Sequence, residues 1–469
     1  MVFSSTVFLF IFLPLTFFLN LILPEKYRNG MLLFFSLLFY AWGEPVFVLI
    51  MLFSITVNYG IGVAMAKGNP KRRKAWLVTA VVANLALLFV FKYTNFFVRN
   101  LNSFFHLNIR IPEIPLPIGI SFFTFQAMSY VIDIYKGTVK AEQKFLNTAL
   151  YISLFPQLIA GPIVKYNDIQ EQLEKREISA RKIKEGIRRF IVGLGKKLLI
   201  ANLIGKTADA VFSMDPNSLN VVLAWVGAVA YCIQIYFDFS GYSDMAIGLG
   251  KMFGFDFKEN FNYPYTATSI TDFWRRWHIS LTSWFREYLY IPLGGNRKGD
   301  KRTLLNIFIV YLCTGFWHGA EWTFLVWGIF HAFFMILERA KIIQTEKFKY
   351  RWLARLYVLL VVLTGFVMFR AENLTQGVKI IGKLFTGFSF QPGWHVMLYD
   401  FLSPLTVLVF FLSFIAATPV LTNLLKDFTE KLTEPKAEGI RNILSIALFL
   451  LCIMAISTET YNPFIYFRF

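Results

Sequence analysis

Long apolar segments constrain this chain more than any other feature of its sequence. A helix needs roughly 20 apolar residues to cross about 30 Å of hydrocarbon. Eight segments qualify: 2–23, 45–65, 75–97, 219–252, 304–337, 352–369, 401–421 and 440–456. Hydrophobic residues make up 56% of the 469 residues and charged residues only 16%, which is more apolar sequence than one water-soluble core can use. The sequence therefore predicts an all-α polytopic membrane protein.

Basic residues between the apolar segments predict the orientation of the chain. The net charge is +18, and Lys and Arg gather in 67–74, 175–189, 275–302 and 338–355. Such loops are cytoplasmic by the positive-inside rule, which places both ends of the sequence on the extracytoplasmic side. Their interleaving with membrane segments excludes a nucleic-acid partner. Attraction to membrane lipids explains these loops, and docking of an acidic carrier or a nucleotide-bearing cofactor on 175–189 and 297–302 is the alternative.

The first apolar segment is expected to remain in the membrane, because no basic region precedes it and no small-residue cleavage site follows it. Cys232, Cys313 and Cys452 lie in apolar segments without metal-ligand spacing, which favours packed thiols over a disulfide framework or a metal site. The sequence thus predicts a single membrane domain over 1–469 and no bound metal.

Prolines and glycines interrupt the chain between residues 112 and 162. Broken backbone is tolerated at membrane depth only where protein buries it or a watery cavity lies beside it. We therefore expect this region to line a cavity, with a hydrogen bond between helices as the alternative for each polar residue. The candidate lining residues are Ser121, Thr124, Gln126, Asp133, Gln157 and Lys165.

Two aspartates lie inside the apolar segment 219–252. Asp238 and Asp244 are costly at membrane depth unless they are paired or hydrated. They are predicted to face the protein interior as partners of arginines or backbone donors, or else to shape a site. Six residues apart, they share no face of a regular helix, and Gly241 between them is a point at which the helix can break.

Tryptophans, arginines and a histidine alternate in segment 272–299. Trp274, Trp277 and Trp284 beside arginines are typical of an interfacial helix with indoles at headgroup level, and His278 is expected within that helix. The glycine pair at 294–295 favours a plain turn over a phosphate-binding loop. A second histidine, His318, lies in an apolar segment, where an imidazole is usually kept for proton transfer, metal ligation or a buried hydrogen bond.

Four stretches of the sequence together resemble the membrane-bound O-acyltransferase superfamily. They are PLPIGISFFTFQAMSYVID (115–133), FDFSGYSDMAIG (237–248), DFWRRWHISLTSWFREYLYIPLGG (272–295) and GFWHGAEWTF (315–324). Within the superfamily the resemblance is to the alginate O-acetyltransferase branch (AlgI), with DltB and PatA as related enzymes, and it covers nearly the whole chain. It implies a bundle of about 11 transmembrane helices, with re-entrant and interfacial helices around a central tunnel.

The resemblance also implies roles for individual residues. The catalytic histidine of the family corresponds to His318, and the second signature position, His or Asn in the superfamily, corresponds to His278. An imidazole base typically contributes about 10²- to 10⁴-fold, so we expect His318 to be the general base and His278 to polarise the acyl carbonyl or position the thioester. Glu321, on the same helical face if the segment is regular, is a candidate to orient His318. The histidines expected to be structural or exposed are His106, His331 and His395.

The aromatic tail at 464–469, FIYFRF, resembles the tails of relatives and the small DltX peptide proposed to carry the acyl group. An aryl ester is more activated than an alkyl ester, so Tyr466 is a candidate acyl relay. In this hypothesis His318 deprotonates Tyr466, and a serine of a partner protein later accepts the acetyl group from it. An interfacial aromatic anchor is the alternative.

Together these features predict an O-acetyltransferase subunit of the bacterial plasma membrane, with acetyl-CoA or another acyl thioester as donor substrate and no cofactor bound. The predicted partners are membrane lipids, an extracytoplasmic SGNH-type acetyltransferase and, indirectly, an alginate-like or other envelope polysaccharide. The alternatives are D-alanyl transfer from a carrier protein, a transporter for an anionic lipid or sugar, and a non-enzymatic scaffold. The last two need no His318.

Overall fold

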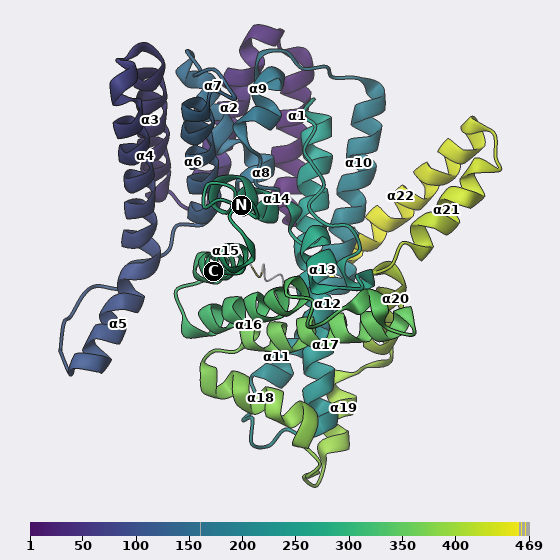
Figure 1. Ribbon diagram of the computed structural model, residues 1–469. Helices are drawn as coiled ribbons and strands as arrows, with labels where there is room; N and C mark the ends of the chain where they lie inside the picture. Colours follow the sequence, from purple (N-terminus) through teal and green to yellow (C-terminus); the bar gives the residue numbers. More distant parts are fainter. Residues whose placement is uncertain (160, 459–460, 462–464, 466–469) are drawn as a thin grey trace. The chain divides into compact units, whose positions relative to one another are not determined.

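The computed structural model describes residues 1–159, 161–458, 461 and 465, and these form helices and connecting loops without a strand. The all-α class is therefore confirmed. The chain divides into two compact units, Met1–Phe190 with Ser243–Lys258 and Ile191–Tyr242 with Glu259–Phe469 (Figure 1). Two of the three borders between them fall inside α10 and α12, and the third falls in the loop after α12; the single domain expected over 1–469 stays a prediction.

Six helices in the described part of the chain are long and apolar enough to cross a membrane, or seven if a pair bent by 67° counts as one span. The six are Phe47–Lys67, Pro70–Phe105, Val221–Met252, Trp322–Arg339, Arg351–Arg370 and Glu434–Thr458. The chain is thus a multi-pass membrane protein. Fewer helices are long and apolar enough to cross a membrane than the expected number of about 11, because several apolar segments fold into shorter or interrupted helices. Segment 304–337, for example, forms two helices separated at residues 319–321.

The first unit is built on its N-terminal helices. A reciprocal amide pair joins two of them: Asn58 and Asn84 donate to each other's Oδ1 over 3.2 and 2.7 Å, the kind of polar contact that holds helices together in lipid. The helices that begin in this unit are α1 (Leu13–Ile22), α2 (Glu25–Ala41), α3 (Phe47–Lys67), α4 (Arg73–Leu88), α5 (Thr94–Phe105), α6 (Ile120–Lys136), α7 (Phe145–Ser153), α8 (Phe155–Leu158), α9 (Tyr166–Glu174) and α10 (Ala180–Gly195).

The polar residues proposed to line a cavity in this unit are all buried. Ser121 accepts a hydrogen bond from Lys92 over 3.0 Å, and Gln157 donates to the carbonyl of Tyr151 over 2.6 Å. These contacts join elements of the protein, as the alternative interpretation expected. The cavity itself stays a prediction.

The second unit contains both signature histidines. Within it, α16 packs against α15 and α17, and α17 against α18, as Figure 1 shows. The helices that begin in this unit are α11 (Asn202–Phe212), α12 (Val221–Met252), α13 (Ile270–Arg276), α14 (Ile279–Phe285), α15 (Asp300–His318), α16 (Trp322–Arg339), α17 (Arg351–Arg370), α18 (Leu374–Thr386), α19 (Trp394–Phe401), α20 (Pro404–Ala416), α21 (Val420–Glu430) and α22 (Glu434–Thr458).

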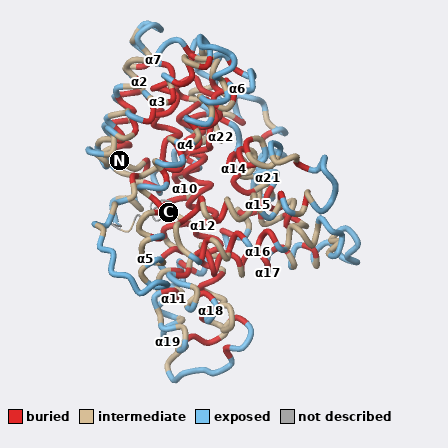
Figure 2. Tube along the Cα trace, turned by 60° about the vertical axis from the view of Figure 1, so that its left-hand side comes forward, coloured by how far each residue is buried: buried red, intermediate tan, exposed pale blue. Residues whose placement is uncertain are grey.

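Helix α12 is buried along most of its length (Figure 2), and both of its aspartates are paired. Asp244 contacts Arg189 at 2.6 Å, and Asp238 contacts Lys197 at 2.6 Å, so both face the protein interior as predicted, Asp244 with an arginine and Asp238 with a lysine where an arginine or a backbone donor was expected. The helix does not break at Gly241. That glycine instead permits close packing, since a Cβ there would lie 2.7 Å from the carbonyl oxygen of Gly193.

Two glycines allow α15 and α16 to pack closely as a hairpin. A Cβ on Gly315 would lie 2.5 Å from the carbonyl oxygen of Phe324, and a Cβ on Gly328 would lie 2.5 Å from that of Tyr311. Small residues at a crossing let helix backbones approach in the membrane. The hairpin they permit fixes the end of α15, where His318 lies.

Candidate active site

His318 is the last residue of α15 and is 4% exposed. Three aromatic rings surround its imidazole: those of Trp317, Trp327 and Phe369, with centroids at 5.0, 5.1 and 5.2 Å. These rings come from α15, α16 and α17 and turn their edges or faces at steep angles to the imidazole. The sequence therefore builds an apolar, water-poor surrounding for His318, in which polar interactions with a substrate are strengthened.

His278 does not lie within a helix, contrary to the expectation. It occupies the break between α13 and α14, with φ 43° and ψ 55°, a left-handed conformation that non-glycine residues adopt rarely and often at functional sites. The ring is 1% exposed, and this burial lowers the pKa of His278 to about 3. The imidazole is therefore neutral at physiological pH.

Asn260 holds the break at His278 and was not among the predicted residues. Its Oδ1 lies 3.2 Å from Nδ1 of His278 and accepts hydrogen bonds from the backbone N–H and the hydroxyl of Ser280 over 3.2 and 2.9 Å. Its backbone carbonyl accepts from the N–H of Ile279 over 2.9 Å. No sequence signal marks Asn260, because its role depends on a turn that brings residues 18 apart into contact.

Trp317 connects the two histidines. Its ring centroid lies 5.0 Å from that of His318 and 6.2 Å from that of His278, and Phe239 of α12 contacts His278 from another side at 4.6 Å. The fold thus brings the two predicted histidines, 40 residues apart in sequence, into one aromatic cluster.

Glu321 and the tryptophans of segment 272–299 differ from the expectation. Because α15 ends at His318 and α16 begins at Trp322, Glu321 lies directly before a second helix and does not share a helical face with His318. Its role in orienting His318 stays a prediction. Trp274, Trp277 and Trp284 are 5%, 3% and 6% exposed, so they pack inside the protein; their position at headgroup level stays a prediction.

Of the three remaining histidines, His331 is fully buried and His106 and His395 are exposed, as expected. The His331 ring contacts Trp274 and Trp327 at 5.0 and 5.1 Å, and neither of its nitrogens has a hydrogen-bond partner among the described residues.

The C-terminal segment is held by carboxylates of the second unit at the two positions that the structure describes there. The hydroxyl of Tyr461 donates to Asp209 over 2.6 Å, and the N–H of Ile465, a residue only 7% exposed, donates to Oδ2 of Asp238 over 2.9 Å. Asp238 is the neighbour of Phe239, which contacts His278. The candidate relay Tyr466 lies outside the described residues.

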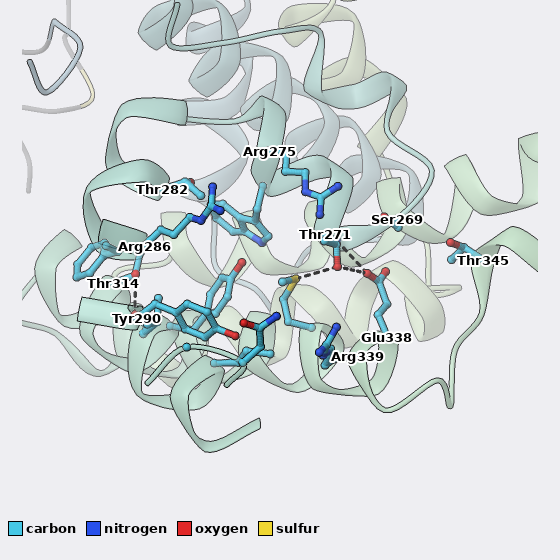
Figure 3. A pocket seen from close by; sticks show the side chains of 18 of the residues that line it. Ser269, Thr271, Arg275, Thr282, Arg286, Tyr290, Thr314, Glu338, Arg339 and Thr345 are labelled. Carbon is cyan, nitrogen blue, oxygen red and sulfur yellow. Dashed lines mark hydrogen bonds between the residues drawn. The ribbon is translucent and has the colours of Figure 1, made fainter. Parts of the chain in front are cut away.

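A cavity of about 1290 Å³ opens in the second unit beside the aromatic cluster that contains His278 and His318 (Figure 3). Neither histidine lines it, but Thr314, one helical turn before His318, and Trp274 do. The ring of Trp274 contacts that of Trp327 at 5.6 Å, and Trp327 contacts His318. Basic side chains dominate the charged lining: Arg275, Arg286, Arg297, Arg339, Lys341 and Arg351, against Glu338 and Glu346.

Glu338 belongs to the cavity wall and also caps α13. Its carboxylate accepts hydrogen bonds from the N–H groups of Ile270 and Thr271 over 2.6 and 2.9 Å and from the hydroxyl of Thr271 over 2.7 Å, as Figure 3 shows for Thr271. A carboxylate at a helix N-terminus satisfies otherwise unpaired donors and the helix dipole. Glu338 thereby ties α13, which leads to His278, to the end of α16.

No group of three or more His, Cys, Asp or Glu side chains able to hold a metal ion occurs among the described residues. The site consists of two buried imidazoles, aromatic rings and an adjoining basic cavity. Such a site can move a proton at a substrate hydroxyl and accommodate an anionic ligand.

Comparison with known proteins agrees with this chemistry. The sequence profile of the membrane-bound O-acyltransferase family (MBOAT) matches residues 143–377. The probable alginate O-acetylase AlgI of Pseudomonas putida is 39% identical, with 100% of both chains covered. The peptidoglycan O-acetyltransferase of Helicobacter pylori is 37% identical over 81% of this chain and 79% of the relative. The teichoic acid D-alanyltransferase of Bacillus subtilis is 27% identical over 50% of this chain and 62% of the relative.

The apolar helices, the family match and the relatives define a membrane-embedded acyltransferase. The chain belongs to the membrane-bound O-acyltransferase family, and it acts on an acyl donor and an acyl acceptor.

Proposed function

We propose that this protein transfers acetyl groups from a cytoplasmic thioester to the extracytoplasmic side of a bacterial plasma membrane, where a cell-envelope polysaccharide is O-acetylated. The observation on which this proposal chiefly rests is the buried His318 at the end of the α15–α16 hairpin, in a chain that aligns over its full length with an alginate O-acetylase. The acceptor is an alginate-like or other envelope glycan, since the relatives include enzymes named for alginate and for peptidoglycan.

The basic cavity supports a phosphate-bearing donor, with acetyl-CoA as the proposed one. Six cationic side chains against two carboxylates line it, and a site of one charge sign attracts an oppositely charged ligand. Segment 275–302 contributes three of these cations, and the positive-inside rule puts that segment on the cytoplasmic side. By the same rule both ends of the sequence are extracytoplasmic.

His318 acts as the general base in this proposal. Its imidazole takes the proton of the acceptor hydroxyl, the hydroxyl oxygen attacks the thioester carbonyl, and the C–S bond breaks. The thiolate leaves with the proton that the imidazolium returns. The aromatic surroundings keep water from competing as the acceptor.

The experiment that tests this function measures ester-linked acetate on envelope polysaccharide in cells lacking the protein, with and without the wild-type gene, and label transfer from radiolabelled acetyl-CoA in their membranes. We expect both signals to require the protein. Transfer of D-alanine from a charged carrier protein, with none of acetate from acetyl-CoA, would favour the D-alanyl alternative, to which the relationship with a teichoic acid D-alanyltransferase points. Unchanged acetate in the absence of the protein would overturn the proposal.

We further propose Tyr466 as an acyl relay to an extracytoplasmic SGNH-type acetyltransferase. The contact of Ile465 with Asp238, beside the residue that touches His278, supports a tail that reaches the histidine cluster. A phenol ester is activated enough to pass its acyl group onward. An aromatic anchor at the membrane interface remains the alternative role of the tail.

The relay predicts an acetylated tyrosine. In membranes loaded with acetyl-CoA and lacking the partner, mass spectrometry is expected to find base-labile acetyl on Tyr466. Tyr466→Phe removes the phenol oxygen and keeps the ring, so it should abolish polysaccharide acetylation while Tyr399→Phe, at an exposed tyrosine, leaves it intact. If cells with Tyr466→Phe acetylated the polysaccharide as fully as the wild type, the relay would be wrong and the tail would serve as an aromatic anchor.

A further inference from the structure

The hydrogen bonds of Asn260 define the protonation of the His278 ring. The backbone N–H of Ser280 can only donate, and it points at the Asn260 atom 3.2 Å away, so this atom is the carbonyl oxygen Oδ1 and not the amide nitrogen. The Ser280 hydroxyl donates to the same oxygen over 2.9 Å. The orientation of the Asn260 side chain is thereby fixed by two donors.

The ring nitrogen of His278 that faces this oxygen must carry a proton. Nδ1 lies 3.2 Å from Oδ1 of Asn260, and a carbonyl oxygen has only lone pairs to offer. The Ser280 hydroxyl also lies 3.4 Å from Nδ1, but its single proton is used in the shorter 2.9 Å bond to Oδ1. A bare Nδ1 would set two lone pairs against each other, whereas an N–H at Nδ1 gives a hydrogen bond. Since a neutral imidazole holds one proton, Nε2 is then the unprotonated nitrogen.

We propose that Asn260 is a positioning residue that holds His278 in the tautomer protonated at Nδ1, so that Nε2 accepts a hydrogen bond from an N–H or O–H of a substrate. This proposal rests on the acyl-transfer function proposed above. It changes the role expected from the sequence: a neutral ring without a proton at Nε2 cannot donate to the developing oxyanion, so His278 positions a substrate and does not polarise its carbonyl.

The packing around the ring keeps this arrangement in place. His278 is 1% exposed and Asn260 is fully buried, and Phe239 stands perpendicular to the imidazole at 4.6 Å. The left-handed backbone at His278, with the Ile279 N–H bonded to the Asn260 carbonyl, fixes the direction of the side chain. A buried polar group with fixed partners has its tautomer set by them.

Two substrate groups have the required chemistry. One is an amide N–H of the pantetheine arm of a coenzyme A thioester, and the other is the hydroxyl of the acyl acceptor. Loss of a contact to the donor raises KM for acetyl-CoA, whereas loss of a contact made by the acceptor hydroxyl in the transition state lowers kcat. Kinetics of Asn260→Leu membranes with radiolabelled acetyl-CoA therefore distinguish the two.

The direct test is ¹⁵N NMR of the full-length protein in nanodiscs with labelled histidine. The chain has five histidines, and the His278 signals are assigned by their loss in His278→Asn. We expect the wild-type ring to show an unprotonated nitrogen at Nε2 and a protonated one at Nδ1. The reverse assignment would overturn the proposal, whatever the activity of the protein.

Variants at Asn260 test its part in holding the tautomer. Asn260→Asp keeps an acceptor for Nδ1–H and should retain the tautomer and most of the transfer rate. Asn260→Leu removes the acceptor and should admit the other tautomer and slow transfer by about 10²-fold, the lower range for a positioned acid or base group. Asn262→Leu, at an exposed asparagine two residues away, is the matched control. If folded Asn260→Leu kept the tautomer of the wild type, the positioning role of Asn260 would be wrong. If the wild type showed the expected tautomer but no acetyl transfer, only the proposed acyl-transfer function would be refuted.

Discussion

Replacing His318 with alanine should reduce acetyl transfer by about 10²- to 10⁴-fold, the usual contribution of a positioned general base, while the protein still folds. The side chain lies at the C-terminal end of α15 and makes aromatic contacts that alanine loses, so membrane abundance has to be matched between variants. The measurement is ester-linked acetate on envelope polysaccharide in cells that carry His318→Ala as their only copy.

His331→Leu is the control for this variant. His331 is an equally buried histidine, also contacts Trp327, and has no hydrogen-bond partner among the described residues. Its replacement removes an imidazole from the same cluster without touching the proposed base, so acetylation should stay near the wild-type level. If His318→Ala restored acetate as fully as the wild type, general-base catalysis by this residue would be wrong, and the transporter or scaffold would become the better interpretation.

Replacing Lys197 with methionine should destabilise the second unit by about 3–5 kcal/mol, because it leaves the carboxylate of Asp238 buried without its cation. The two side chains are 3% and 2% exposed and lie 2.6 Å apart. Asp238 also accepts the N–H of Ile465, so the C-terminal segment should loosen together with the pair. Unfolding of purified protein in detergent, followed by tryptophan fluorescence, measures the loss.

Two further variants isolate the charge. Lys197→Met combined with Asp238→Asn removes the uncompensated charge and keeps an oxygen that accepts the Ile465 N–H, and it should regain most of the lost stability. Lys426→Met breaks a pair whose side chains are 69% and 63% exposed, and it should cost at most about 1 kcal/mol. If Lys197→Met and Lys426→Met lowered the free energy of unfolding by the same amount, the buried pair would not stabilise the fold more than an exposed one.

The apolar pattern predicted the helical class and most long helices, because hydrocarbon thickness imposes their length regardless of tertiary context. His318 was selected because an imidazole is costly in an apolar segment, and the structure buries it as that argument expects; its catalytic role stays a prediction. The ends of α15 and α16 were missed, because the run 304–337 is apolar throughout. The break at residues 319–321 lets α16 pack back on α15, and the close approach at Gly315 and Gly328 is visible only in the folded hairpin.

The surroundings of His278 were beyond prediction for a different reason. An alternation of tryptophan and arginine describes an interfacial helix and a helix packed inside a bundle equally well, and the structure buries Trp274 and Trp277. Asn260 is an ordinary asparagine in sequence. The three contacts of its side chain with the turn at 278–280, and the fourth through its backbone carbonyl, form only once α12, α13 and α14 have packed, so no local sequence pattern predicts them.

The dual position of Glu338 has a consequence for inhibition. Its carboxylate stands in the wall of the basic cavity and at the same time holds the first turn of α13, eight residues before His278. A compound that fills the cavity and draws this carboxylate away would release the helix start and disturb the histidine without ever touching it. A screen for ligands of the cavity therefore has no need to reach the aromatic cluster itself, and resistance would be expected to arise at residues 270, 271 and 338 rather than at the histidines.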